Sequence, residues 1–281
     1  SLATEVVDYH KKITQQLDLT SKTFLDDIES LFSKLKEKIA HPPSANFDFE
    51  YDQIASFGEL FSTLIISEYL NSVNKISKWF DARKIIRTDN KYREAKVDWE
   101  NTKELVFNNI QSFIESTSES KIAVTQGFIG HTDTGQTTTL GREGSDFSAA
   151  ILAWCLNAKE VTIWKDVPGV LNADPKYFNN CVKLNTISFK EAIELSYYGA
   201  SVIHPKTIKP LQNLNIPLFV KSFINPKESG TEIQSSVVND ALIPSFIFKQ
   251  NQLLISISPK DFSFIAEDNL SEIFNAFSNY G

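Results

Sequence analysis

Apolar residues recur at every third or fourth position in several long stretches of the chain, and this spacing predicts amphipathic helices. The first stretch covers residues 1–40, in which Lys, Glu and Asp separate the apolar positions. The same pattern predicts helices over residues 51–71, where Gly58 and Glu59 interrupt it, and over residues 98–116. Such apolar stripes usually face a core or another helix, so they indicate structure and carry no chemistry of their own.

Shorter runs of apolar and β-branched residues predict buried strands. They cover residues 78–86, 122–125, 161–164 and 216–221. Helices are predicted to follow some of these strands, at residues 147–156, 188–198 and 206–214, and the second of them opens with a capping box, Ser188-Phe-Lys-Glu191. Because short strands alternate with longer helices, we expect an α/β fold with a mostly parallel sheet.

In the last part of the chain, a predicted linker is followed by another predicted strand and helix. Residues 230–244 look like a linker, residues 245–258 predict a strand or hairpin, and residues 270–280 predict a helix. This unit is too short to bury a core by itself. We therefore expect it to pack on another surface or to be part of a larger module.

Composition narrows the class of protein. The net charge of −7 argues against nucleic acid as a partner, because binding to phosphates needs a basic face. The two cysteines, Cys155 and Cys181, exclude a disulfide framework and fit a reducing compartment. The four histidines lack ligand spacing, so no zinc site is expected, and no apolar run is long enough to span a membrane. The expectation is a cytoplasmic enzyme. Methionine is absent and the first residue is Ser1.

Residues 124–146 combine a predicted strand, a glycine-rich loop and the start of a helix. This order brings unpaired backbone N–H groups and the positive end of a helix dipole to one point, where anions bind. Arg142 can hold a carboxylate or phosphate in a bidentate fork, and Asp146 lies at the helix start, where it can also meet a cation. The alternative is a surface loop with an N-capping Ser145 and an exposed arginine. Neither a Walker loop nor a G-x-G-x-x-G fingerprint occurs.

Seven motifs stand out along the chain. They are, in order, G-E-L (58–60), W-F-D-A-R (79–83), V-T-Q-G-F-I-G (124–130), T-T-T-L-G-R-E-G-S-D-F-S-A (137–149), I-W-K-D-V-P-G-V (163–170), A-D-P (173–175) and Y-Y-G-A-S-V-I-H-P (197–205). These motifs resemble those of the aspartokinases, a branch of the amino-acid kinase family, and the resemblance covers residues 47–233. Long motifs in this order make chance an unreasonable explanation.

The resemblance implies the domain organisation. Residues 1–235 are expected to form an amino-acid kinase catalytic domain, a three-layer sandwich with a mostly parallel sheet. Residues 236–281 resemble the start of an α+β ACT domain, the module through which aspartokinases sense lysine or threonine. If so, the loop at residues 259–269 is the expected effector site, and paired ACT units would make a homodimer or a higher homo-oligomer.

The resemblance also implies the reaction and the site that performs it. The expected activity is transfer of the γ-phosphoryl group of ATP to the side-chain carboxylate of L-aspartate, in lysine, threonine and methionine biosynthesis. Arg142 would hold the α-carboxylate of aspartate and Glu59 its α-ammonium, although Glu59 alone reads as a solvated helix residue. Asp146 would organise the centre, and Gly127, Phe128 and Ser145 would line the pocket.

The nucleotide would lie next to the turn that follows the strand at residues 161–164. The resemblance implies contacts to adenosine and phosphates from Lys165, Asp166, Val170, Leu171, Asp174, Lys176 and Ser201. Mg²⁺ would bridge the phosphate oxygens.

Three departures from the family pattern affect these expectations. The family opens with a strand and a K-F-G-G-T-S loop, which this sequence lacks; if Ser1 is the true start, we expect little or no kinase activity. Ser201 stands where many members have a phosphate-contacting lysine, and Lys165, where threonine is common, is a candidate to supply that charge. Glu143 stands where glycine is frequent, and we expect its side chain to face solvent.

Two alternatives to an aspartate kinase stay open. Other amino-acid kinases, such as glutamate kinase, share the fold, although G-R-E-G-S-D together with G-E-L favours aspartate. The second alternative is a catalytically silent fragment that binds aspartate or an effector.

Overall fold

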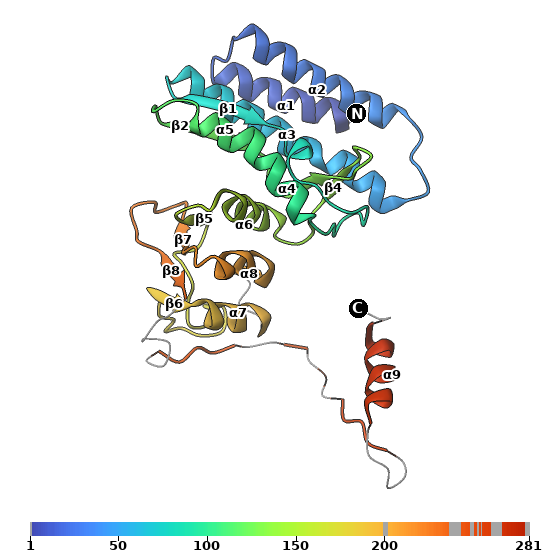
Figure 1. Cartoon of the computed structure of the whole chain (residues 1–281), viewed down its shortest axis with the longest axis vertical. Coiled ribbons are helices and arrows are strands. Elements are labelled where there is room, and N and C mark those ends of the chain that lie inside the picture. The colour runs from blue at the N-terminus through green and yellow to red at the C-terminus, as the bar shows by residue number, and fades with distance from the viewer. Residues whose placement is uncertain are drawn as a thin grey trace. The chain divides into compact units, whose positions relative to one another are not determined.

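The structure is a computed structural model that describes residues 2–198, 202–235, 243–247, 250–251, 253, 255–259 and 266–278. The chain divides into two compact units, Ser1–Phe248 and Lys249–Gly281, and each is described by itself (Figure 1). The first unit holds every motif named above.

Three helices precede the first strand: α1 (Leu2–Gln16), α2 (Lys22–Ala40) and α3 (Phe47–Ser72). The single helix predicted over residues 1–40 is wrong, because the chain turns at Asp18, which has a positive φ of 52°, and Ser21 caps α2 by accepting from the Phe24 N–H. The predicted interruption at Gly58 and Glu59 does not occur, since α3 runs through both residues. All three helices pack together along their apolar faces (Figure 1).

The first pair of strands is parallel: β1 (Ile76–Phe80) pairs with β2 (Lys121–Thr125). The strand predicted over residues 78–86 is too long, because Asp81 accepts from the Arg83 N–H and starts a 3₁₀ turn at Ala82–Lys84. The crossover between the strands is helical, as predicted for residues 98–116. It consists of α4 (Trp99–Val106), a π-helical turn (Phe107–Gln111) and α5 (Ser112–Glu115).

The glycine-rich stretch is more regular than the predicted loop. It contains an antiparallel hairpin, β3 (Ile129–His131) and β4 (Thr137–Thr139), in which every residue is buried. Helix α6 (Gly144–Leu156) then begins three residues before the predicted start at Phe147. Glu143 occupies the N-cap, so the alternative with Ser145 as the capping residue is wrong.

A four-stranded sheet follows, in the order β5 (Val161–Lys165), β7 (Leu218–Ser222), β8 (Thr231–Gln234) and β6 (Thr186–Ser188). Pairs β5–β7 and β6–β8 are parallel, whereas β7–β8 is antiparallel. Strand β8 lies inside the stretch predicted as a linker.

Helices α7 (Phe189–Tyr198) and α8 (Pro205–Asn213) belong to the same part of the fold. The predicted capping box is confirmed at its first half, since Ser188 Oγ accepts from the Glu191 N–H at 3.0 Å. Pro205 stands in the first turn of α8, where its missing N–H costs nothing.

Helix α6 contributes to both hydrophobic clusters of this unit. Ile151 and Cys155 belong to the cluster built with α2, α3 and β1, while Ala150 and Ala153 belong to the cluster built with β5, β7 and α8. The helix that carries the candidate site is therefore held on two sides.

The second unit contains one helix among its described residues, α9 (Glu267–Ser278), which confirms most of the helix predicted at residues 270–280. The predicted strand at residues 245–258 is not formed in the described part of that range. The ACT-like module, with the boundary at residues 235 and 236, stays a prediction. In the part of the chain that the structure describes, none of the helices is both long and apolar enough to cross a membrane.

Candidate active site

The T-Q-G-F loop, residues 125–128, which join β2 to β3, packs directly against the start of α6. A Cβ atom added to Gly127 would lie 2.8 Å from the Cα atom of Ser145, and one added to Gly144 would lie 2.7 Å from the Phe128 ring. These distances are far below ordinary contact, so both positions need glycine. The two motifs, separate in the sequence, thus form one surface.

Phe128 is fixed by its backbone. It has a positive φ of 71°, its N–H donates to Ser148 Oγ at 2.9 Å, and its carbonyl accepts from the Leu140 N–H at 2.8 Å. Ser148 Oγ in turn donates to the Gly144 carbonyl, so Phe128 and the first turn of α6 are held in register.

A buried carboxylate that the sequence reasoning missed joins three segments around this surface. Asp52 on α3 is fully buried and accepts from the Arg93 N–H at 2.9 Å and from the Thr139 N–H and hydroxyl at 2.8 Å each. In the sequence, Asp52 reads as one more polar residue of an amphipathic helix, and only the fold shows it turned inward.

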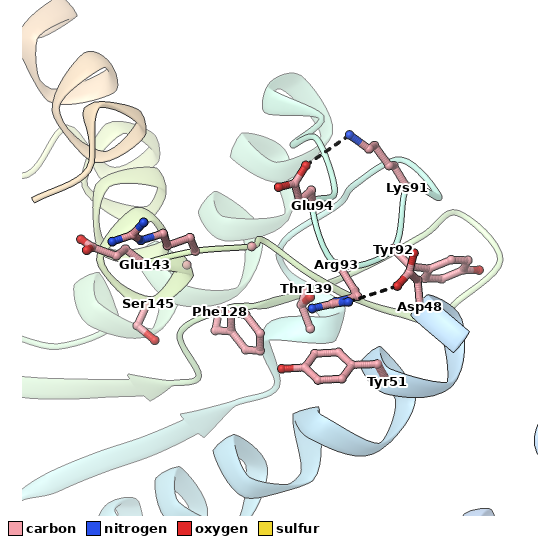
Figure 2. A pocket seen from close by; sticks show the side chains of 13 residues that line it. Asp48, Tyr51, Lys91, Tyr92, Arg93, Glu94, Phe128, Thr139, Glu143 and Ser145 are labelled. Atoms are coloured by element: carbon pink, nitrogen blue, oxygen red, sulfur yellow. Dashed lines mark hydrogen bonds and ion pairs between the residues drawn. The ribbon is translucent and has the colours of Figure 1, made fainter. Parts of the chain in front are cut away.

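An open hollow of about 790 Å³ lies over this surface, a size within the range of small-molecule sites. Arg142, Ser145 and Phe128 line it, together with Tyr51 and Arg93. Figure 2 shows Ser145 and Phe128 toward one end and Arg93, Tyr92 and Asp48 toward the other. Arg142 is exposed, so its guanidinium is available to an anion from solvent.

Glu59 is not among the residues that line this hollow. It is only partly exposed on α3, and desolvation by burial raises the pKa of its carboxyl group. One turn later, Thr63 Oγ1 accepts from Gln126 Nε2 at 2.7 Å and from Trp79 Nε1 at 2.9 Å. Because Gln126 directly precedes Gly127, these bonds tie the Glu59 turn of α3 to the T-Q-G-F loop.

Lys165, the last residue of β5, forms an ion-pair cluster with the start of α6. Its Nζ lies 2.7 Å from Asp146 Oδ2 and 3.6 Å from Glu143 Oε2. The Glu143 side chain is only 18% exposed. The expectation that Glu143 faces solvent is therefore wrong: the left-handed backbone at this position, with φ of 54°, places its carboxylate beside Lys165.

The residues proposed to contact the nucleotide occupy the segment that follows β5. Asp166, Asp174 and Lys176 are exposed, and Asp174 Oδ1 accepts from the Lys176 N–H at 2.9 Å. Leu171 is partly exposed, but Val170 is buried, its N–H donates to Thr231 Oγ1 and its carbonyl accepts from the Leu184 N–H, so both of its backbone polar groups already have partners. Ser201 lies outside the described residues.

No group of three metal-ligating side chains converges in the described part of the chain. His204, the N-cap of α8, has a pKa lowered by burial and by the positive charges of Lys206 and Arg142, while Glu143 opposes the shift. Burial, the largest cause, and these positive charges thus disfavour the protonated imidazole.

The family model of the amino acid kinase family matches residues 6–222. This chain therefore belongs to the amino acid kinase family.

Within the family, the chain is similar to aspartokinases. It is 38% identical to the lysine-sensitive aspartokinase 3 of Escherichia coli (strain K12) over 206 residues, which are 73% of this chain and 45% of that protein. It is 37% identical to a chloroplastic bifunctional aspartokinase/homoserine dehydrogenase 2 of Arabidopsis thaliana over 240 residues, 81% of this chain and 25% of that protein.

Solved structures of aspartokinases are also similar to this chain. The structure of E. coli aspartokinase III in complex with aspartate and ADP (R-state) matches with a TM-score of 0.75 and 34% identity, over 84% of this chain and 53% of that one. The complex of the same enzyme with lysine and aspartate (T-state) matches with a TM-score of 0.72. The chain spans about half, or less, of the length of these proteins.

Proposed function

We propose that this chain carries the catalytic region of an aspartate kinase, which transfers the γ-phosphoryl group of ATP to the side-chain carboxylate of L-aspartate. One observation carries the proposal: the T-Q-G-F loop and the start of α6 form a single surface, with Arg142 and Ser145 on an open hollow. The likeness to an aspartokinase structure that contains aspartate and ADP supports it.

L-aspartate is proposed to lie over this surface. Arg142 binds its α-carboxylate in a bidentate fork, and Glu59 binds its α-ammonium. Ser145, Gly127 and Phe128 shape the pocket, and glycine at position 127 lets the loop pack directly against Ser145. Asp146, in the first turn of α6, organises the centre through its ion pair with Lys165.

The nucleotide is proposed to lie at the carboxyl end of β5, where open α/β sheets bind their ligands. Lys165 and the segment from Asp166 to Lys176 contact its phosphates and adenosine, and Ser201 belongs to the same proposed set. Mg²⁺ fits as a partner of the phosphates, because this ion needs only one or two carboxylates beside phosphate oxygens, and Asp166 and Asp174 in this segment are exposed. It would neutralise phosphate charge.

The charges of this site suit the proposed transfer. The attacking carboxylate and the triphosphate repel each other, so catalysis depends mainly on positioning and on neutralising charge. Arg142 supplies positive charge for the carboxylate of aspartate, and Lys165, which also pairs with Glu143 and Asp146, supplies it for the phosphates. A lysine or threonine effector is proposed on the same likeness, since a similar enzyme is described as lysine-sensitive. A homo-oligomeric assembly is proposed on the predicted ACT-like unit alone.

The test measures ADP release from ATP and Mg²⁺ with L-aspartate or L-glutamate as acceptor, together with aspartate binding by calorimetry. We expect turnover with aspartate and none with glutamate. Turnover with glutamate but not with aspartate would establish the alternative of a glutamate kinase. Saturable aspartate binding without ADP release would establish the catalytically silent binding fragment.

A further inference from the structure

Lys165 forms ion pairs with the carboxylates of Glu143 and Asp146, and its ammonium compensates the negative charge of both. The side chains of Glu143, Asp146 and Lys165 are only 18%, 14% and 23% exposed. The oxygens nearest the ammonium, Glu143 Oε2 and Asp146 Oδ2, are buried and receive no well-directed hydrogen bond from any residue that the structure describes. Two negative charges thus share one positive charge in a poorly solvated place, where an unpaired carboxylate is costly.

The backbone at Glu143 adds a second observation. Its φ of 54° is left-handed, which is unfavourable for a residue with a Cβ atom. The Glu143 side chain also makes no capping hydrogen bond to α6, so its carboxylate acts on the helix start only through the helix dipole. Capping therefore does not explain a glutamate here, whereas the contact with Lys165 does.

We propose that Glu143 is a positioning residue for Lys165: the negative charges of Glu143 and Asp146 hold the ammonium at the start of α6, and an N–H that they leave free is presented to a phosphate of the nucleotide. An ammonium has three N–H donors, Glu143 Oε2 attracts it from 3.6 Å without coming within hydrogen-bonding distance, and the Lys165 side chain stays 23% exposed. This inference rests on the proposed function, because the nucleotide is the ligand assigned to this end of β5.

A double-mutant cycle with Glu143→Gln and Lys165→Met tests the proposal through ADP binding to the full chain, measured by calorimetry. Lys165→Met is expected to weaken ADP binding about tenfold or more, as for loss of one charged hydrogen bond. Glu143→Gln alone weakens it several-fold, because the ammonium is no longer held on that side. With methionine at position 165, Glu143→Gln instead strengthens binding, because it removes an unpaired carboxylate beside the phosphates.

Two readouts separate positioning from a general structural effect. Adenosine, which has no phosphate, is expected to bind equally to all four proteins. In turnover, Glu143→Gln raises KM for ATP by a larger factor than KM for aspartate, although Glu143 also lines the hollow beside Arg142. The matched control is Glu194→Gln, which removes the ion pair between Lys190 and Glu194 on α7. These side chains are 84% and 53% exposed, so ADP binding should not change. Glu143→Gly, which suits the left-handed backbone, replaces Glu143→Gln if that variant does not fold.

Equal effects of Glu143→Gln in both backgrounds, or no effect with Lys165 present, would overturn the proposal. If the unaltered protein binds ADP but the substitutions are additive, only the role of Glu143 fails. If the unaltered protein neither binds ADP nor phosphorylates aspartate, the proposed function fails, and the inference with it.

Discussion

Asp52 and Thr139 are 87 residues apart in the chain and joined by two hydrogen bonds of 2.8 Å, one from the Thr139 N–H and one from its hydroxyl. A third hydrogen bond comes from the Arg93 N–H, so the fully buried Asp52 carboxylate accepts from three donors. Helix α3 is thereby fixed to the hairpin that leads into the glycine-rich segment. The position of Glu59, two turns further along α3, depends on this connection.

Asp52→Asn is expected to destabilise the protein by about 1–3 kcal/mol, because an amide nitrogen would face N–H donors in a buried place. The free energy of unfolding, measured in urea, gives the value. Asp48→Asn is the control: Asp48 is 55% exposed and 3.4 Å from Arg93, so its loss should cost less than about 1 kcal/mol. Equal losses in the two variants would contradict the structural role of Asp52.

Gly127→Ala is expected to weaken aspartate binding and to cost about 1–3 kcal/mol of stability, because the new methyl group would meet Ser145 at 2.8–2.9 Å and displace the start of α6. Gly58→Ala is the matched control, since nothing lies within 4 Å of its Cβ position on α3. There alanine should raise the free energy of unfolding by up to about 1 kcal/mol. Calorimetry with aspartate and urea unfolding check both variants, and unchanged aspartate affinity in Gly127→Ala would count against the proposed pocket.

Glu59→Gln is expected to change stability in a pH-dependent way. Burial raises the pKa of the Glu59 carboxyl above its value in the unfolded chain, so ionisation of this group is penalised by folding. The wild type therefore carries the full penalty above the folded-state pKa and none below the unfolded-state pKa. Glutamine removes the penalty, so the variant should be the more stable protein at neutral pH and lose that advantage as pH falls.

Unfolding curves from pH 7 to pH 4 for the two proteins, together with aspartate binding, test this point. Aspartate affinity should drop in the variant at neutral pH, because the amide cannot pair with the α-ammonium group. A stability difference that does not depend on pH would show that the Glu59 carboxylate is not held in a desolvated place.

The two cysteines are expected to differ in reactivity. Burial raises the pKa of the Cys155 thiol to about 12, so almost no thiolate forms near pH 8, and the side chain is only 7% exposed. Cys181 is less buried, and its thiol donates to the Phe178 carbonyl. Iodoacetamide at pH 8 should modify Cys181 in the folded protein and both residues in urea, as peptide mass spectrometry would show. Rapid modification of folded Cys155 would contradict the core packing of α6.

Helices and strands could be predicted from the sequence where a local pattern alone determines them. Strand β5, helix α6 and the Ser188 cap were predictable, because apolar periodicity and capping chemistry are local. The hairpin β3–β4 was not, since its strands have only three residues each, Ile-Gly-His and Thr-Thr-Thr, which is too short to show an alternation of apolar and polar positions. Strand β8 was hidden for a similar reason, between glycine and serine residues that resemble a linker.

In the candidate site, too, residues close together in the sequence could be grouped in advance, whereas contacts between distant segments could not. Arg142, Ser145 and Asp146 stand in one recognisable segment, so their grouping could be read from the sequence. The pairing of Glu143 with Lys165 could not, because it depends on a left-handed backbone at one residue and on a strand that ends opposite it. The inward orientation of Asp52 likewise depends on partners that lie far away in the chain.

The central claim is phosphorylation of aspartate on its side-chain carboxylate, and trapping of the product tests it most directly. The full-length protein is incubated with ATP, Mg²⁺ and L-aspartate in the presence of hydroxylamine, which converts an acyl phosphate into a hydroxamate. The account predicts the β-hydroxamate of aspartate, formed in step with ADP and lost in Arg142→Ala. ADP release without hydroxamate, or hydroxamate formed from glutamate instead of aspartate, would contradict it.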